Sequence, residues 1–169
     1  IEKTFKFKKE LKDKKNQKLI GVSWDTKSKA QMAFFRTIPL NDLAIKLHDP
    51  NIKLVNLQYG EVTKELSDLN NELGIKILDI KEIDNTNDID TLASLICACD
   101  LVVSIDNFLG LLSGSLGVDT RILLPFAAES RWGLKDKKSY IYDSVSLYRQ
   151  NVLGNWEIAL NKLIEDVKS

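Results

Sequence analysis

Three polar side chains follow an apolar run near the middle of the chain. Residues 101–105 read LVVSI, a β-branched run typical of a buried strand, and Ser104, Asp106 and Asn107 stand at its end. A helix is predicted to begin at Asp106, which would place these side chains beside backbone N–H groups that attract anions. A hydroxyl, a carboxylate and an amide there can bind a phosphate or a sugar hydroxyl. The alternative is that Asp106 only caps the helix, and that Ser104 and Asn107 are ordinary polar residues of a strand end.

Basic residues lie in the loop that follows an earlier apolar run, residues 19–24. Lys27 and Lys29 could reach a diphosphate there, although solvation at the surface is the default for lysine. Arg36 comes shortly before a predicted helix that starts at Pro39. It either clamps a phosphate or pairs with a carboxylate near that helix start.

A glutamine and a tyrosine close a third apolar run, residues 52–58. Gln58 and Tyr59 could hold the edge or the ring of a nucleobase, whereas turn packing would also explain them. The three tryptophans, Trp24, Trp132 and Trp156, are interpreted as packing residues, and Trp24 is the one best placed to line a cleft.

Several other chemistries find no support in the sequence. Neither a G-x-G-x-x-G nor a G-x-x-x-x-G-K-[ST] motif occurs, which argues against a dehydrogenase or a P-loop ATPase. The single histidine, His48, is interpreted as a surface or helix-end residue. Cys97 and Cys99 are spaced wrongly on a helix for a disulfide or a metal pair, which favours a reducing cytoplasm. No metal site is predicted.

The elements that position these residues alternate between strands and helices. Apolar runs predict strands at 19–24, 52–58, 75–78, 101–105, 121–124 and 145–148, with amphipathic helices at about 39–47, 61–71, 88–99, 106–117 and 155–167 between and after them. Alternation of this kind predicts an α/β, Rossmann-like, doubly wound parallel sheet. Ligands of such sheets bind outside the carboxyl ends of the strands, where the polar candidates lie.

Charge is unevenly distributed along the chain. The 169 residues carry 24 basic and 24 acidic side chains, and this balance argues against binding to nucleic acid or an anionic membrane. No apolar run approaches the length of a membrane span, and no signal peptide is predicted. Residues 1–18 hold eight lysines and three acidic residues, and are interpreted as a basic linker or tail. The single domain is expected at 19–169, and the initial Ile suggests a piece of a longer protein.

Several short motifs occur in an order found in a known family. They are ACDLVVSIDN (98–107) with SGSLG (113–117), IGVSW (20–24), RTIPL (36–40), LQYG (57–60), LPF (124–126), RW (131–132) and LYRQ (147–150). Together they resemble the heptosyltransferase-like and tetratricopeptide-linked glycosyltransferases over nearly the whole domain.

This resemblance implies the C-terminal half of a GT-B glycosyltransferase, the half that binds a nucleotide diphosphate-sugar. Transfer of the sugar to a hydroxyl acceptor would be metal-independent and would need an N-terminal GT-B domain, which supplies the base, so the isolated chain is expected to be inactive. The residues that the resemblance and the loop argument assign to the donor are Ser104, Asp106, Asn107, Lys27, Arg36, Gln58 and Tyr59.

One position departs from the family pattern. Leu111 stands where the family has a histidine near the donor phosphates, and leucine can neither donate a hydrogen bond nor carry charge. A second hypothesis is therefore a non-catalytic binding or scaffold module that has kept the Rossmann-like fold.

Overall fold

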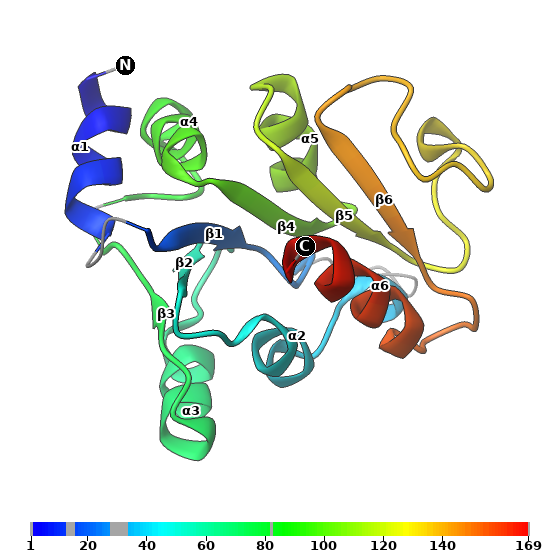
Figure 1. Cartoon of the computed structure of the whole chain (residues 1–169), viewed down its shortest axis with the longest axis horizontal. Coiled ribbons are helices and arrows are strands. Elements are labelled where there is room, and N and C mark those ends of the chain that lie inside the picture. Colours follow the sequence, from blue (N-terminus) through cyan, green and yellow to red (C-terminus); the bar gives the residue numbers. More distant parts are fainter. Residues whose placement is uncertain (1, 13–15, 28–33, 82, 169) are drawn as a thin grey trace.

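A computed structural model of the chain describes residues 2–12, 16–27, 34–81 and 83–168. Six parallel strands form one sheet in the order β3-β2-β1-β4-β5-β6 (Figure 1). The strands are β1 (Lys18–Val22), β2 (Ile52–Asn56), β3 (Ile77–Leu78), β4 (Leu101–Ile105), β5 (Thr120–Leu124) and β6 (Val145–Arg149). The predicted strands and the Rossmann-like α/β class are therefore confirmed.

Helices cover both faces of the sheet (Figure 1). They are α1 (Glu2–Leu11), α2 (Leu40–Leu47), α3 (Thr63–Leu73), α4 (Ile89–Ala98), α5 (Phe108–Ser115) and α6 (Glu157–Lys168), with short 3-10 helices η1 (Phe34–Arg36) and η2 (Ser130–Trp132). One layer contains α1, α4 and α5, and the other contains α2, α3 and α6. The two layers follow from the right-handed crossovers that join parallel strands.

Alternation along the central strands fills a core on each side. In β4, Leu101, Val103 and Ile105 pack into the cluster beneath α2 and α6, whereas Val102 packs into the cluster beneath α4. All five β4 residues are buried, because the strand has a helix layer on both faces. The apolar run that predicted this strand is thus explained by burial on both sides.

The first helix was not predicted. The basic segment 1–18 was interpreted as a linker or tail, but Glu2–Leu11 forms α1, which packs along α4 and buries Leu11. Lys8 and Lys12 place their ammonium groups 3.2 and 2.7 Å from the two carboxylate oxygens of Asp100. Burial acts to raise the pKa of Asp100, but Lys12, the Leu19 amide and Lys8 outweigh it and hold the pKa below its ordinary value.

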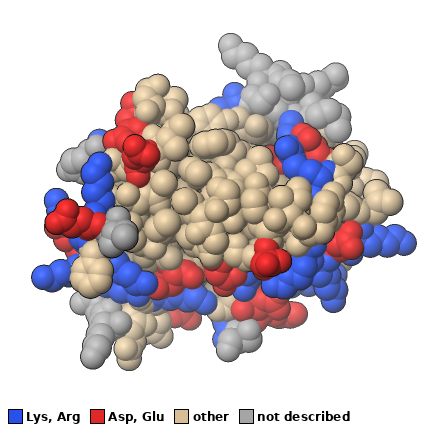
Figure 2. Space-filling model, turned by 90° about the horizontal axis from the view of Figure 1, so that it is seen from above, with Lys and Arg blue, Asp and Glu red and all other residues tan. Residues whose placement is uncertain are grey.

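The α4–α5 side of the molecule is nearly free of charge. Figure 2 shows a broad uncharged surface there, with the lysines, arginines and acidic residues at its margin. Asp90 is the one charged residue of α4, and α5 has none. Within the described part of the chain, no helix has both the length and the apolar composition of a bilayer span.

Candidate functional site

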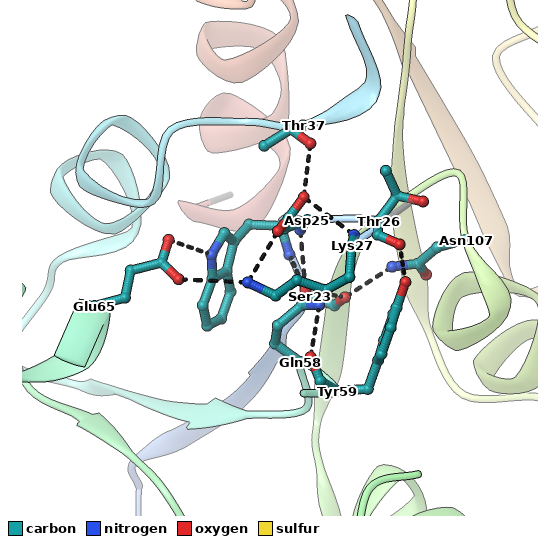
Figure 3. A network of polar contacts seen from close by, with 10 residues as sticks. Ser23, Asp25, Thr26, Lys27, Thr37, Gln58, Tyr59, Glu65 and Asn107 are labelled. Carbon is teal, nitrogen blue, oxygen red and sulfur yellow. Dashed lines mark hydrogen bonds and ion pairs between the residues drawn. The ribbon is translucent and has the colours of Figure 1, made fainter. Parts of the chain in front are cut away.

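The chain changes direction at the middle of the sheet. From β1 it passes to β2 and β3 on one side, and from β4 to β5 and β6 on the other, so β1 and β4 are neighbours at a topological switch point. Crevices that bind ligands form at this point, outside the carboxyl ends of the strands. Ser23 follows β1, Gln58 follows β2 and Asn107 follows β4, and Figure 3 shows that their side chains meet there.

Gln58 is the centre of this polar network. Its buried Oε1 accepts hydrogen bonds from the Ser23 hydroxyl at 3.0 Å, the Trp24 amide at 3.0 Å and the Asp25 amide at 2.9 Å (Figure 3). The Gln58 backbone N–H donates to the Asn56 side chain, and Nε2 donates to the Tyr59 carbonyl. Gln58 therefore fixes the chain that leaves β1. Its amide oxygen is already fully used by protein donors.

Asn107 links β4 to β1 across the switch point. Its Nδ2 donates to the Ser23 hydroxyl at 2.8 Å, while its Oδ1 accepts from the Ser104 hydroxyl at 2.9 Å and the Gly110 amide at 3.2 Å. The last of these bonds makes Asn107 the N-cap of α5. The prediction that the helix opens at Asp106 with that residue as its cap is therefore wrong by one position.

Lys27 lies at the same edge, between two carboxylates. Its Nζ is 3.0 Å from Asp25 and 4.0 Å from Glu65, and Glu65 also accepts from the Trp24 indole N–H at 2.9 Å (Figure 3). Burial acts to raise the pKa of Asp25, but hydrogen bonds from Lys27 and Thr37, together with the Lys27 charge, hold it below its ordinary value. The cation at this edge is thus neutralised by the protein itself.

Tyr59 closes the loop that carries Lys27. Its hydroxyl donates to the Thr26 carbonyl, which brings the half-buried ring alongside residues 25–27. On the other side of Gln58, the ends of β2 and β3 border a pocket of about 210 Å³ whose polar lining includes Asn56, Asp79 and Asn85.

Asp106 lies away from this network and serves a different contact. Its side chain is 1% exposed, and Oδ1 accepts from the Trp132 indole N–H at 2.8 Å. Arg131 Nη2 stands 3.8 Å from the same oxygen. The carboxylate therefore holds the turn that follows β5.

Arg36 belongs to this second group. Its guanidinium pairs with the Glu129 carboxylate at 3.7 Å. A carboxylate pair was one of the two roles considered for Arg36, but the partner was expected near the start of the helix at Pro39 and lies instead far along the chain. Phe35, Arg36 and Glu129 line a pocket of about 200 Å³ beside the loop after β5.

The structure thus divides the predicted residues between two clusters. Lys27, Gln58, Tyr59, Ser104 and Asn107 share the network at the switch point, whereas Asp106 and Arg36 belong to the group around Glu129 and Arg131. Lys29 lies outside the described residues.

Trp24 and Trp132 are fully buried and Trp156 is 6% exposed, so all three tryptophans pack in the core as interpreted, and Trp24 does not line a cleft. Several residues of the two clusters were missed. The missed residues are Ser23, Asp25, Thr37, Glu65, Glu129 and Arg131. The motif RW at 131–132 was a signal for Arg131, but it carried no assigned role.

Within the described residues, no three histidine, cysteine, aspartate or glutamate side chains gather as a metal site. Metal-independent chemistry therefore remains a prediction.

Comparison with known proteins supports the fold. No protein-family model matches the chain. It is similar to protein FlbA of Caulobacter vibrioides, with 33% identity over 117 residues, which are 69% of this chain and 19% of FlbA.

Two solved structures share its fold. The E. coli ADP-heptose LPS heptosyltransferase II matches with a TM-score of 0.63 at 12% identity, over 99% of this chain and 53% of that one. A glycosyl transferase family 9 protein from Veillonella parvula matches with a TM-score of 0.61 at 12% identity, over 100% of this chain and 44% of that one. The chain therefore has a glycosyltransferase fold and spans about half the length of each structure.

Proposed function

We propose that this chain is the donor-binding domain of a glycosyltransferase and binds a nucleotide diphosphate-sugar at the carboxyl edge of its sheet. The observation that carries the proposal is the buried Ser23–Gln58–Asn107 network, which joins the two halves of the sheet at their switch point. Such a network holds the loops after β1, β2 and β4 in place, and these are the loops that bind nucleotides in doubly wound sheets. The fold shared with two glycosyltransferases supports the same function.

Each part of the donor has a suitable group along this edge. The pocket between the ends of β2 and β3 is polar and, at about 210 Å³, has room for a nucleobase. Lys27, the cation of the network, is 33% exposed at its side chain and can exchange its carboxylate partners for a diphosphate. The start of α5, capped by Asn107, presents backbone N–H groups to an anion.

Sugar transfer by the whole enzyme needs two further contributions. An acceptor hydroxyl must lose a proton to a base, and the diphosphate must be stabilised as it leaves. This chain provides the second contribution through Lys27 and the start of α5. An N-terminal domain supplies the first in the proposed enzyme, so residues 1–169 alone transfer no sugar.

An NMR titration with UDP, GDP and ADP tests the proposal. We expect amide shifts at Ser23, Gln58, Tyr59 and Asn107 with at least one nucleotide. Lys27→Ala should weaken that binding by about 1–3 kcal/mol, the usual contribution of a hydrogen bond to a charged group. Lys64→Ala, which removes a 93% exposed lysine on α3, is the matched control. Shifts confined to His48 or to the lysines of α1 would show that the proposed site is wrong.

A scaffold without nucleotide binding is the second candidate, and Leu111 is the observation that favours it. Leu111 packs against an apolar cluster that contains Ile122, Leu124 and Trp132, where the glycosyltransferase pattern has a histidine. Under this hypothesis, Leu111→His creates no nucleotide affinity because its surroundings are apolar. Calorimetry on folded wild type and Leu111→His decides between the two. Binding by the wild type supports the donor domain, whereas no binding by either protein supports the scaffold.

A further inference from the structure

An arginine that the proposed function does not use stands in the turn after β5. Arg131 Nη2 lies 2.8 Å from one carboxylate oxygen of Glu129. The other oxygen of Glu129 lies 3.7 Å from Arg36 Nη1. One carboxylate is therefore held between two guanidinium groups that come from segments far apart in the sequence.

The turn that carries Arg131 is firmly anchored. Trp132 is fully buried, its indole N–H donates to Asp106, and its carbonyl accepts from the Arg149 guanidinium. Gln150 Oε1 accepts from the amide of Phe126 at 3.1 Å, which fixes the beginning of the same loop. Because these anchors come from the ends of β4 and β6, the position of Arg131 is set by the sheet.

The Glu129 side chain is more exposed than those of the two arginines. It is 54% exposed, against 26% for Arg36 and 37% for Arg131, and although Glu129 precedes η2 it makes no capping hydrogen bond. The ion pairs given for it in the described part of the chain are those with Arg36 and Arg131. Exposed ion pairs of this kind contribute little to stability, so this carboxylate can leave at small cost.

Two buried polar atoms beside these ion pairs have no partner among the described residues. They are Arg131 Nε, a donor of the kind that an anion accepts from, and Asp106 Oδ2, an acceptor that takes no part in binding an anion. Buried groups of this kind are rare in folded proteins, because an unmade hydrogen bond costs free energy. The pocket of about 200 Å³ that Arg36 and Glu129 line opens next to this group.

We propose that Arg36 and Arg131 bind an oxyanion of the phosphate or diphosphate class at the place of the Glu129 carboxylate, which competes with that ligand. A phosphate group carries more charge than a carboxylate and accepts hydrogen bonds from two guanidinium groups at once. Binding exchanges the Glu129 ion pairs for stronger ones and leaves the anchored turn in place. The site is separate from Lys27 and the start of α5, to which the proposed function assigns the donor diphosphate. The anion site itself rests on the arginine geometry.

The test uses inorganic pyrophosphate and residues 1–169. Calorimetry on wild type, Arg131→Ala, Arg131→Lys and Glu129→Gln measures affinity. Lys64→Ala is the control for Arg131→Ala, and Asp68→Asn is the control for Glu129→Gln. Asp68 is 53% exposed on α3, at the far end of the sheet, and its replacement by Asn removes one negative charge, as Glu129→Gln does. We expect Arg131→Ala to weaken binding by about 10-fold or more, the loss of a charged hydrogen bond, and Arg131→Lys to weaken it less. Glu129→Gln should tighten binding by about 2- to 5-fold, the equivalent of an exposed ion pair.

The readouts separate this inference from the proposed function. Equal affinities for Arg131→Ala and Lys64→Ala, or no tightening by Glu129→Gln, would overturn the anion site, as would undetectable pyrophosphate binding. A shift of the Trp132 indole N–H on titration of the wild type would support it. If UDP, GDP or ADP binds at the Ser23–Gln58–Asn107 network and pyrophosphate binding shows no dependence on Arg131, the anion site is wrong and the donor domain stands. If pyrophosphate binding depends on Arg131 but no nucleotide binds more tightly than pyrophosphate, the anion site stands and the donor domain is wrong.

Discussion

Replacing Gln58 by alanine removes the acceptor at the centre of the switch-point network. The Oε1 atom receives three hydrogen bonds, from the Ser23 hydroxyl and from the amides of Trp24 and Asp25. The two amides belong to the backbone and cannot turn toward other acceptors. We therefore expect Gln58→Ala to destabilise the domain and to loosen the loop after β1.

The expected loss follows from the number of buried donors left without an acceptor. Each costs about 1–3 kcal/mol, and water entering the space of the missing side chain recovers part of the sum, so the net loss should be about 2–4 kcal/mol. For a domain of this size, that corresponds to a fall in melting temperature of about 4–16 °C.

Urea unfolding followed by circular dichroism measures this loss. Gln150→Ala is an informative comparison, because Gln150 Oε1 accepts from two backbone amides instead of a hydroxyl and two amides. Its loss should be smaller than that of Gln58→Ala. Asn71→Ala on the exposed face of α3 should change the free energy of unfolding by less than about 0.5 kcal/mol. A Gln58→Ala variant as stable as Asn71→Ala would refute the claim that this amide oxygen organises the edge of the sheet.

Three other features lead to measurable predictions. Gly21→Ala should lower the free energy of unfolding, measured with urea, by about 1–3 kcal/mol, because a Cβ there would clash with Leu57 Cδ1. An unchanged stability would contradict this close contact. The pKa of Asp100 in the folded protein lies below its ordinary value of 3.8. The ionised Asp100 carboxylate therefore stabilises the fold fully above pH 3.8, and this contribution is lost as the pH falls through the lower folded-state pKa. Asp100→Asn should reduce the loss of unfolding free energy at acidic pH, measured by urea unfolding between neutral and acidic pH. Burial, and next the Asp100 charge, raise the pKa of Cys99 to about 12. A thiol reagent at mild alkaline pH should therefore react only with the half-buried Cys97 in the folded protein, and with both cysteines after denaturation. Two rapid reactions in the folded state would contradict the packing.

The sheet and most helices could be predicted because their signals are local. Apolar runs marked all six strands, and the helix expected at about 88–99 is α4, whose N-cap Asp88 accepts from the Thr91 amide. The helix α1 was not predicted in this way, since its sequence is highly charged and contains few apolar residues. Its contacts with α4 and with Asp100 stabilise it, and those partners lie some 90 residues away.

The roles within the candidate site depended on similarly distant partners. Asp106 and Asn107 are both good helix caps by residue type, and they stand next to each other. Asn107 takes the cap, while Asp106 is drawn to the indole of Trp132, which is 26 residues further along the chain. The sequence could thus show that polar groups gather at the ends of the strands, but it could not show which of them pair with one another.

This pairing also bears on how a chain with no net charge would bind the proposed anion. At the switch point Lys27 is balanced by Asp25 and Glu65, and in the turn after β5 Arg131 is balanced by Glu129 and Asp106. The amide oxygen of Gln58 is saturated by protein donors, so it can position a ligand's surroundings but offers the ligand no free acceptor. Affinity must then come from cations that exchange a protein carboxylate for a ligand oxyanion. The free energy of such an exchange is the difference between the cation's ion pair with the ligand and its ion pair with the protein carboxylate. The acidic residues beside each cation therefore set the affinity as much as the lysine and the arginines do.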